Sequence, residues 1–314
     1  MSIQSFRPKN WKDYFGQESV INNLKVYVSS AKTQNKSLDN ILIHGPSGMG
    51  KTSLAYLIAH VMNQKIHILN GPSLQKPSDL ISTLTMVKEK EVLFIDEIHA
   101  VNKEVLEILY PVLEENKMSL IIGKDYNSKI INLKIPEVTI IVATTELNKL
   151  PVPFTNRFAI NLHLKNYSKS EISSIISSAA KKIHLNFTSE FSDILSSYCK
   201  QTPRIAINLL KRIHDYIIYE DNEILSESRI KEILLKMNIF EYGLNEMDVN
   251  YLSIVKEYQP VGVETIAHII STPVSVILSV VEPPLLIQNL IKRTSKGRML
   301  TDKGITFILK NNFY

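Results

Sequence analysis

The sequence predicts an α/β protein in which a parallel-sheet domain is followed by two smaller domains, and three observations lead to this fold. The first 165 residues alternate short apolar runs with helical patterns, which is typical of a parallel sheet covered by helices on both faces. Helical patterns then continue alone, and the last portion combines four prolines with a short basic turn. We therefore expect domains over residues 1–167, 168–238 and 239–314.

Composition limits the class of protein. The chain has 314 residues, more than one ordinary core holds, and a formal net charge of +5, which suits a nucleic-acid partner but is also common without one. Cys199 is the only cysteine, which excludes an intramolecular disulfide and a cysteine-based metal cluster. No run approaches the roughly 18 apolar residues of a membrane span, and residues 1–10 lack the apolar core of a signal peptide. We expect a cytoplasmic protein that contacts no membrane.

Four short apolar runs, rich in branched residues, are expected to form buried strands of the sheet: residues 41–44, 66–69, 92–95 and 138–143. Helical patterns at residues 53–62 and 103–114 lie between them. The runs at 120–122 and 130–133 flank a turn-rich stretch at 123–127, which predicts a β-hairpin inserted into the α/β pattern.

The second domain is predicted from four amphipathic helical patterns, at residues 170–183, 189–199, 204–219 and 226–237. Ser168 and Ser226 are suitable N-caps, and only Ser168 is followed three residues later by a glutamate, Glu171, as a capping box requires. In the third domain, a basic turn at residues 293–298 lies between two apolar stretches. Helices followed by a small basic hairpin are typical of a winged-helix module.

A phosphate-binding loop is the strongest motif in the chain. Residues 45–52 read GPSGMGKT and fit the pattern G-x-x-x-x-G-K-[ST] in full. Glycines let backbone N–H groups approach phosphate oxygens, Lys51 reaches the β- and γ-phosphates, and Thr52 ligates Mg²⁺. The alternative is an ordinary glycine-rich turn with a chance Lys-Thr. The apolar run before the loop and the helical pattern after it favour nucleotide binding.

Polar residues follow two of the expected strands. Asp96 and Glu97 end the run at 92–95, where Asp96 would complete the Mg²⁺ shell and Glu97 would polarise the attacking water. Such a pair also occurs at solvated strand ends. Thr145 follows the run at 138–143, where it would either orient that water or be a simple strand-end hydroxyl. The phosphate loop makes the catalytic interpretation stronger, because both sites belong at the carboxyl ends of sheet strands.

Two arginines complete the candidate site. Arg157 precedes Phe158 on a proline-containing segment, a setting that is usual for a surface residue. Arg204 opens a helical pattern directly after Pro203, where the helix dipole disfavours a cation. Its position is more easily understood if an anion lies close by.

In this order, these motifs resemble those of an AAA+ ATPase, and their flanking residues resemble the RuvB family of Holliday-junction branch-migration motors. The resemblance covers nearly the whole chain. It rests on residues 7–9 (RPK), 15–18 (FGQE), 93–99 (LFIDEIH), 121–124 (IIGK), 143–145 (ATT), 202–206 (TPRIA), 243–248 (GLNEMD) and 293–298 (RTSKGR).

The resemblance implies a role for each matching position. Contacts to ATP and Mg²⁺ would come from Phe6 and Arg7 beside the adenine and ribose, Tyr167 near the base, and Gly48, Gly50, Lys51, Thr52 and Ser53 at the phosphates. Further residues near the nucleotide would be Glu114, Glu115 and Asn116. Catalysis would use Lys51, Asp96, Glu97, the first sensor Thr145 and the second sensor Arg204. Arg157 would be the arginine finger, which reaches the γ-phosphate of a neighbouring subunit in a homohexamer.

The resemblance also implies partners. Arg293, Lys296 and Arg298 would contact phosphates of the duplex DNA arms of Holliday junctions, without reading sequence. The hairpin at residues 120–133 would bind the junction-recognising protein RuvA, and a junction resolvase would be a further partner. The implied function is ATP-driven branch migration in homologous recombination and DNA repair.

Some positions depart from the family pattern. Ala100, Glu146 and Thr155 stand where the family usually carries arginine, and the hairpin tip at 125–129 lacks the usual Gly-Pro-Ser pattern.

Two other functions stay open. A clamp-loader-like AAA+ ATPase would have a helical collar after Asn238, and a DNA-binding subunit without ATP hydrolysis would not need the catalytic residues that this chain retains.

Overall fold

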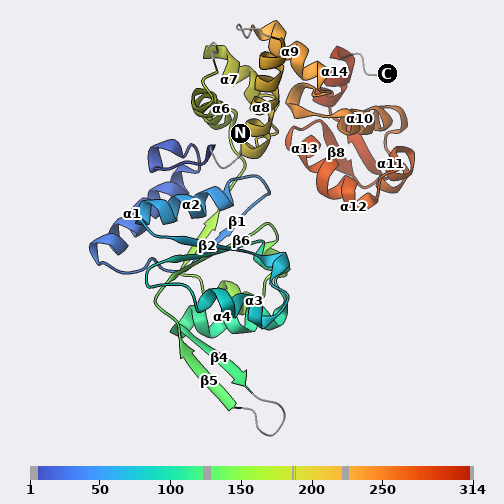
Figure 1. The fold of residues 1–314 in the computed structure, drawn as a ribbon. Coiled ribbons are helices and arrows are strands. Elements are labelled where there is room, and N and C mark those ends of the chain that lie inside the picture. The colour runs from blue at the N-terminus through green and yellow to red at the C-terminus, as the bar shows by residue number, and fades with distance from the viewer. Residues whose placement is uncertain (1–5, 123–128, 186, 188, 221–225, 312–314) are drawn as a thin grey trace. The chain divides into compact units, whose positions relative to one another are not determined.

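The structure is a computed structural model that describes residues 6–122, 129–185, 187, 189–220 and 226–311 (Figure 1). It divides into two compact units, Met1–Glu171 with Thr202–Arg204, and Ile172–Gln201 with Ile205–Tyr314. The second unit contains both smaller domains that the sequence predicts, so the three-domain division stays a prediction.

A five-stranded parallel sheet forms the centre of the first unit, in the order β2-β3-β6-β1-β7. The strands are β1 (Ile41–His44), β2 (Ile66–Asn70), β3 (Val92–Asp96), β6 (Thr139–Thr144) and β7 (Ile160–His163). The predicted parallel sheet is confirmed. In detail, β2 is only half-buried because it lies at an edge, and β7 was not predicted. Its buried and exposed residues alternate over only four positions, as in an edge strand.

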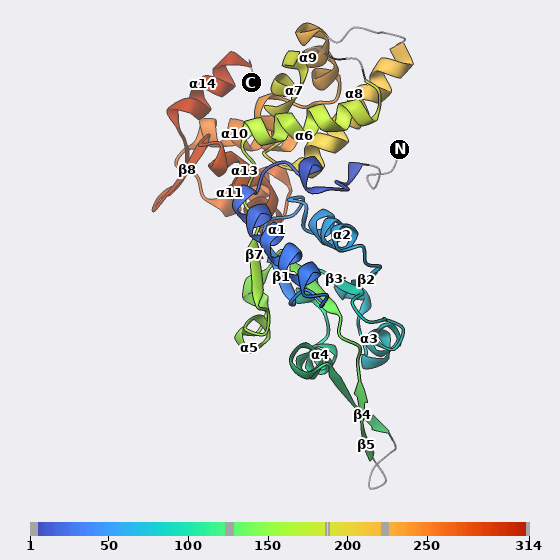
Figure 2. The same cartoon turned by 90° about the vertical axis from the view of Figure 1, so that its left-hand side faces the viewer.

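Helices cover both faces of this sheet. Figures 1 and 2 show α1 (Glu18–Thr33) and α2 (Lys51–Met62) on one face, and α3 (Pro77–Leu84) and α4 (Lys103–Glu115) on the other. Alternate strand residues such as Leu93 and Ile95 form one hydrophobic core with α3 and α4. A short helix, α5 (Val152–Thr155), precedes β7. The covered sheet fixes where each strand ends, and therefore where the polar residues after β1, β3 and β6 meet.

The predicted hairpin is confirmed. Strands β4 (Lys117–Ile122) and β5 (Lys129–Lys134) pair antiparallel and extend away from the sheet beyond α4 (Figure 1). Ile131 and Leu133 on β5 are 41% and 37% exposed, although both are large and apolar. The predicted turn at 123–127 lies outside the described residues.

The second unit begins with the helices α6 (Lys169–Lys182), α7 (Ser189–Ser196), α8 (Pro203–Glu220) and α9 (Glu227–Lys236). The predicted capping box before α6 is present: the Ser168 N–H donates to Glu171 Oε2 at 2.6 Å, and the Glu171 N–H donates to Ser168 Oγ at 3.2 Å. Ser226 caps α9 as predicted. Helix α7 ends three residues earlier than expected.

The C-terminal part has the winged-helix arrangement that the sequence predicts. Its helical segments are α10 (Glu246–Tyr258), α11 (Val263–Ile270), α12 (Val274–Val276), the π-helical segment η8 (Ile277–Val281), α13 (Glu282–Ile287) and α14 (Asp302–Lys310). Strands β8 (Ile291–Thr294) and β9 (Gly297–Leu300) form the basic hairpin. Two backbone hydrogen bonds join Val261 and Arg298 and hold the hairpin against the segment before α11. The chain after Asn238 thus forms a winged helix rather than the helical collar expected of a clamp loader.

Among the residues that the structure describes, no single helix has the length and apolar character needed to cross a membrane. The pair formed by Val263–Ile270 and Val274–Ile287, bent by 110°, reaches that length and composition only jointly.

Candidate functional site

The phosphate loop connects the end of β1 to the start of α2. Gly45 has φ +146, and a Cβ there would lie 2.3 Å from the Leu164 carbonyl oxygen, so only glycine fits. Gly48 and Gly50 also have positive φ values, and Gly50 is the N-cap of α2. Because Gly50 has no side chain to cap the first N–H groups of α2, these donors can bind an anion. Ser53 lies in this first turn.

Lys51 lies inside the curve of the loop. Its ammonium donates to the carbonyl oxygens of Gly45 at 2.8 Å and Pro46 at 3.1 Å. Burial lowers the pKa of Lys51 from its ordinary value, while the Glu97 and Asp96 carboxylates oppose that shift. The structure thus places one positive charge against the backbone of the phosphate loop.

Two oxygen atoms next to Lys51 are suited to a magnesium ion. The Thr52 hydroxyl donates to Asp96 Oδ2 at 2.7 Å, which joins the first turn of α2 to the end of β3. Magnesium prefers hard oxygen ligands and is usually held by one or two protein groups together with water and phosphate. The donor set formed by Thr52 and Asp96 therefore fits Mg²⁺.

The candidate water-activating groups also meet at the strand ends. Thr145 Oγ1 donates to Glu97 Oε2 at 3.2 Å, which links the residues that follow β6 and β3. Glu97 has φ +49, a conformation that is uncommon for a residue with a side chain. Backbone strain of this kind clusters at functional sites. A histidine that the sequence left without a role, His99, also contacts Glu97.

The predicted adenine-side residues lie on the other flank of the loop. Phe6 is buried, and the Arg7 guanidinium lies 3.7 Å from the centre of the Tyr56 ring on α2. The Tyr167 hydroxyl donates to the Met49 carbonyl oxygen at 3.2 Å. Burial raises the pKa of Tyr167 to about 12, so this phenol stays a hydrogen-bond donor at neutral pH.

Tyr14 belongs to the same group, although no sequence motif pointed to it. The Tyr167 hydroxyl lies 3.4 Å from the Tyr14 hydroxyl, and burial raises the pKa of Tyr14 as well. On the far side of the loop, Arg204 Nη1 lies 3.4 Å from Ser47 Oγ, and the Arg204 N–H donates to the Gly48 carbonyl oxygen at 3.4 Å. The structure therefore places Arg204, the second-sensor candidate, beside the phosphate loop.

Four predicted residues lie at the opposite end of the sheet. Arg157 Nε is 2.9 Å from Glu114 Oε1, and the Arg157 guanidinium lies 4.4 Å from the centre of the Tyr110 ring. Glu115 and Asn116 follow at the end of α4. This group lies near Asn40, which bonds to Leu113 and Ile160 and immediately precedes β1. A four-residue strand is about 13 Å long. Arg157 is therefore remote from the phosphate loop of its own chain.

The basic hairpin of the second unit contacts a buried carboxylate of the preceding helix. Glu282, at the start of α13, is fully buried and accepts hydrogen bonds of 2.8 Å from Tyr251 Oη, Arg293 Nε and Arg298 Nε. Burial by itself raises the pKa of Glu282, but the bonds from Arg298, Tyr251 and Arg293 outweigh it and leave the pKa below its ordinary value. The Arg293 side chain is 48% exposed and that of Arg298 only 17%. Lys296 is exposed at the hairpin turn.

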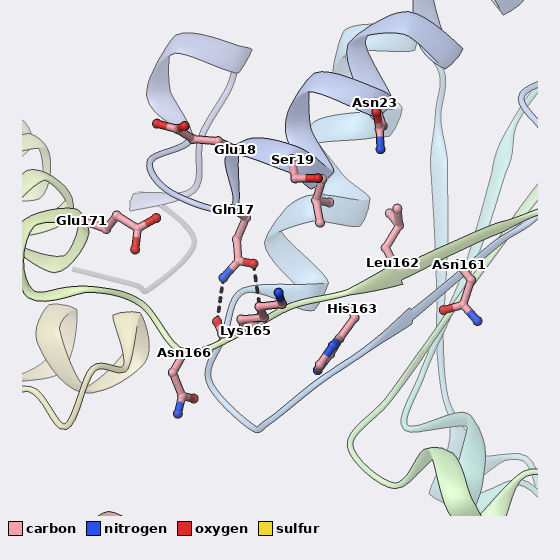
Figure 3. A pocket seen from close by; sticks show the side chains of 11 residues that line it. Gln17, Glu18, Ser19, Asn23, Asn161, Leu162, His163, Lys165, Asn166 and Glu171 are labelled. Carbon is pink, nitrogen blue, oxygen red and sulfur yellow. Dashed lines mark hydrogen bonds between the residues drawn. The ribbon is translucent and has the colours of Figure 1, made fainter. Parts of the chain in front are cut away.

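A polar pocket of about 480 Å³ lies beside the start of α1 and the edge strand β7 (Figure 3). Gln17 spans one wall, where its side-chain amide bonds to both the carbonyl oxygen and the N–H of Lys165, at 2.6 and 3.1 Å. His163 lines the pocket and stacks on His44, with ring centres 4.6 Å apart. None of the residues predicted to bind nucleotide lines it.

A covered parallel sheet with a phosphate loop after β1 and an acidic pair after β3 defines a P-loop protein of the AAA+ class. Family models agree along the chain: the Holliday junction DNA helicase RuvB P-loop domain matches residues 6–164, the RuvB AAA lid domain 167–239, and the RuvB C-terminal winged helix domain 241–309. The chain belongs to the RuvB family.

Individual relatives resemble the chain over its full length. It is 39% identical to the Holliday junction branch migration complex subunit RuvB of Mycoplasmopsis synoviae, over 98% of both chains. It is 42% identical to the protein of the same name from Ureaplasma parvum serovar 3, over 98% of this chain and 97% of that one. The solved structure of the Thermotoga maritima RuvB Holliday junction branch migration motor has a TM-score of 0.81 at 32% identity and covers 99% of each chain.

Proposed function

We propose that the chain is an ATP-hydrolysing subunit of a ring that drives duplex DNA arms through branch migration at Holliday junctions, in recombination and repair. The cytoplasm is its expected compartment. The observation that supports this most directly is the meeting of Lys51, Thr52, Asp96, Glu97 and Thr145 at the carboxyl edge of one sheet. The names of the full-length relatives support the choice of substrate.

In this proposal, each group at the strand ends has one task. Lys51 and the N–H groups of the loop bind the β- and γ-phosphates, and Arg204 adds a second cation on the Ser47 side of the loop. Thr52 and Asp96 would hold Mg²⁺, which neutralises developing phosphate charge when bound. Glu97 accepts a proton from the attacking water, and Thr145 keeps the carboxylate in position.

The position of Arg157 supports assembly of several subunits into a ring. Because it lies at the amino end of the sheet with Glu114, it cannot reach the γ-phosphate bound by its own chain. Arg157 could instead act as an arginine finger at the γ-phosphate bound by a neighbouring subunit. If each subunit contacts the next in this way, the subunits form a closed ring, which we propose is a homohexamer. Glu114, Glu115 and Asn116 would then lie next to the neighbouring subunit's nucleotide.

The two hairpins would form the surfaces that contact the partners. The exposed Ile131 and Leu133 of β5 suit an apolar protein contact, and we propose RuvA as its occupant. The basic hairpin β8–β9 would contact DNA phosphates through Lys296 and Arg293. A junction resolvase stays a predicted further partner.

Phosphate release tests the function directly. We expect ATP turnover that rises when four-way junction DNA and RuvA are added, together with conversion of the junction to duplexes. The Glu97→Gln variant, which keeps the size of the side chain, is expected to bind ATP but to lose turnover by about 10²-fold or more, as removal of a general base does. Stimulated turnover without conversion of the junction would contradict the proposed branch-migration activity. No turnover by the unaltered protein would contradict the proposed ATPase.

A further inference from the structure

His99 links the water-activating carboxylate to the turn that follows β6. Its Nδ1 lies 3.3 Å from Glu97 Oε2 and 3.0 Å from Thr144 Oγ1. Its Nε2 lies 3.4 Å from Glu146 Oε1. The imidazole is only 13% exposed. One ring therefore touches the residue after β3 and two residues at the end of β6.

The surroundings of the ring are themselves fixed. The Glu146 N–H donates to Thr144 Oγ1 at 2.9 Å, and Lys149 Nζ lies 2.6 Å from Glu146 Oε2. Thr145, between these residues, donates to the same Glu97 oxygen that lies 3.3 Å from His99 Nδ1. The Glu97 carboxylate is thus held from two directions, by a hydroxyl after β6 and by an imidazole two residues along its own chain.

Glu146 determines which hydrogen bonds are open to the His99 ring, as a comparison with an arginine at this position illustrates. An arginine offers only donors, and it would compete with a proton on His99 Nε2. A carboxylate accepts from Nε2–H, which turns the Nδ1 edge of the ring toward Thr144 and Glu97. The side chain at position 146 thereby influences which edge of the His99 ring faces Glu97.

We propose that His99 is a positioning residue for Glu97, and that Glu146 sets the orientation of the His99 ring. The inference rests on the proposed ATPase function. A hydrogen-bonded histidine in a partly buried site is often only structural, and the same sheet contains a matched example. His67 Nε2 lies 2.6 Å from Glu91 Oε2, and its side chain is 14% exposed, but this pair lies near the amino end of β3 and away from the phosphate loop.

The experiment compares substitutions that keep different parts of the ring. Asparagine places an amide near the Nδ1 position, and glutamine places one near the Nε2 position. We expect His99→Ala to lower kcat for ATP by at least about 10-fold, which is part of the roughly 10²- to 10⁴-fold that a positioned general base contributes. The dissociation constant for ATP should stay within about 2-fold, since His99 touches none of the phosphate-loop residues. His99→Asn should retain more turnover than His99→Gln.

Glu146→Gln should reduce kcat less than His99→Ala, because Thr144 still holds the ring. His67→Ala is the control and should leave kcat unchanged. Equal kcat in His99→Ala and the unaltered protein, an equal loss in His67→Ala, or better turnover with glutamine than with asparagine would each overturn the proposal.

A crystal structure of the His99→Ala variant gives a readout that does not depend on turnover. We expect the Glu97 carboxylate to leave Thr145, and an unmoved carboxylate would overturn the positioning role. If the unaltered protein hydrolyses no ATP, the proposed function fails, but the position of Glu97 in this crystal structure still decides the role of His99.

Discussion

At the scale of single residues, the acidic pair depends on a glycine that the motifs do not include. Gly71 follows β2 and is buried directly against the backbone after β3. A Cβ at Gly71 would lie 2.1 Å from the Glu97 carbonyl oxygen and 3.2 Å from the Asp96 carbonyl oxygen. Neither of these backbone atoms can move aside as the end of a flexible side chain can. Gly71 thus gives Glu97 room for its strained conformation.

We expect Gly71→Ala to shift Glu97 and to lower ATP turnover by about 10-fold or more, since small displacements of reacting groups are costly. ATP binding should change little, because Lys51 and the loop lie on a different strand end. Gly262→Ala is a suitable control, since a Cβ there would have its nearest neighbour 4.0 Å away. Turnover and nucleotide affinity measured for both variants check this, and unchanged turnover in Gly71→Ala would contradict it.

The convergence of the predicted site residues could be inferred from sequence motifs, whereas several of their contacts could not. Lys51, Thr52, Asp96, Glu97 and Thr145 come together as predicted, because strand-end positions converge in any parallel sheet. The contacts of Gly71, His99 and Glu282 could not be predicted in this way. Each depends on which strands or helices become neighbours, and this information is not local in the sequence.

At the scale of elements, Glu282 anchors the side chains of the basic hairpin, in addition to the backbone bonds between Arg298 and Val261. Arg298 is mostly buried against this carboxylate, whereas Lys296 is exposed. Lys296 and Arg298, two of the three predicted DNA-binding residues, should therefore behave differently. We expect Lys296→Gln to flatten the dependence of log K for duplex DNA on log salt concentration by about one unit. Arg298→Gln should weaken binding with a smaller change in slope. Equal flattening in binding titrations of both variants would contradict this division.

The same cluster makes the stability of the C-terminal part depend on pH. The pKa of Glu282 is lowered in the folded protein, so the ionised carboxylate stabilises the fold above its ordinary pKa near 4.5, and this contribution is lost as the pH falls through the lower folded value. Glu282→Gln should cost about 3 kcal/mol at pH 7, at the lower end for a broken buried ion pair because Arg293 is half-exposed. Denaturant unfolding at pH 7 and pH 3.5 checks both effects. A variant as stable as the parent at pH 7 would rule out the anchoring role.

Element prediction succeeded where the apolar pattern was long or strongly hydrophobic. The central strands, the hairpins and the helices α6 to α9 were found, with ends shifted by a few residues. Strand β7 was missed because its four alternating residues form no apolar run. Helix α1 was also missed, although its buried residues Ile21, Leu24, Val28 and Ala31 have helical spacing. A signal for α1 was therefore present, whereas β7 is defined mainly by its pairing with β1.

At the scale of the whole molecule, the position of Arg157 predicts that active sites are shared between subunits. Arg157→Ala should bind ATP but lose about 10³- to 10⁵-fold in hydrolysis, as loss of an arginine finger does. Mixing it with the Glu97→Gln variant should restore part of the turnover. In a mixed ring, an intact Glu97 site on one subunit meets an intact Arg157 from its neighbour. Each variant alone provides the baseline, and a mixture no more active than their sum would place Arg157 outside the site.

The separation of Arg157 from its own phosphate loop has a consequence for the protein when it is scarce. If Arg157 acts as the finger we propose, a solitary subunit would keep its own phosphate loop but would lack the cation that a neighbour supplies for hydrolysis. Turnover per chain should then climb steeply with protein concentration and nearly vanish on dilution. Assembly itself would act as the switch, so that nucleotide is conserved until enough copies gather on DNA to do work together.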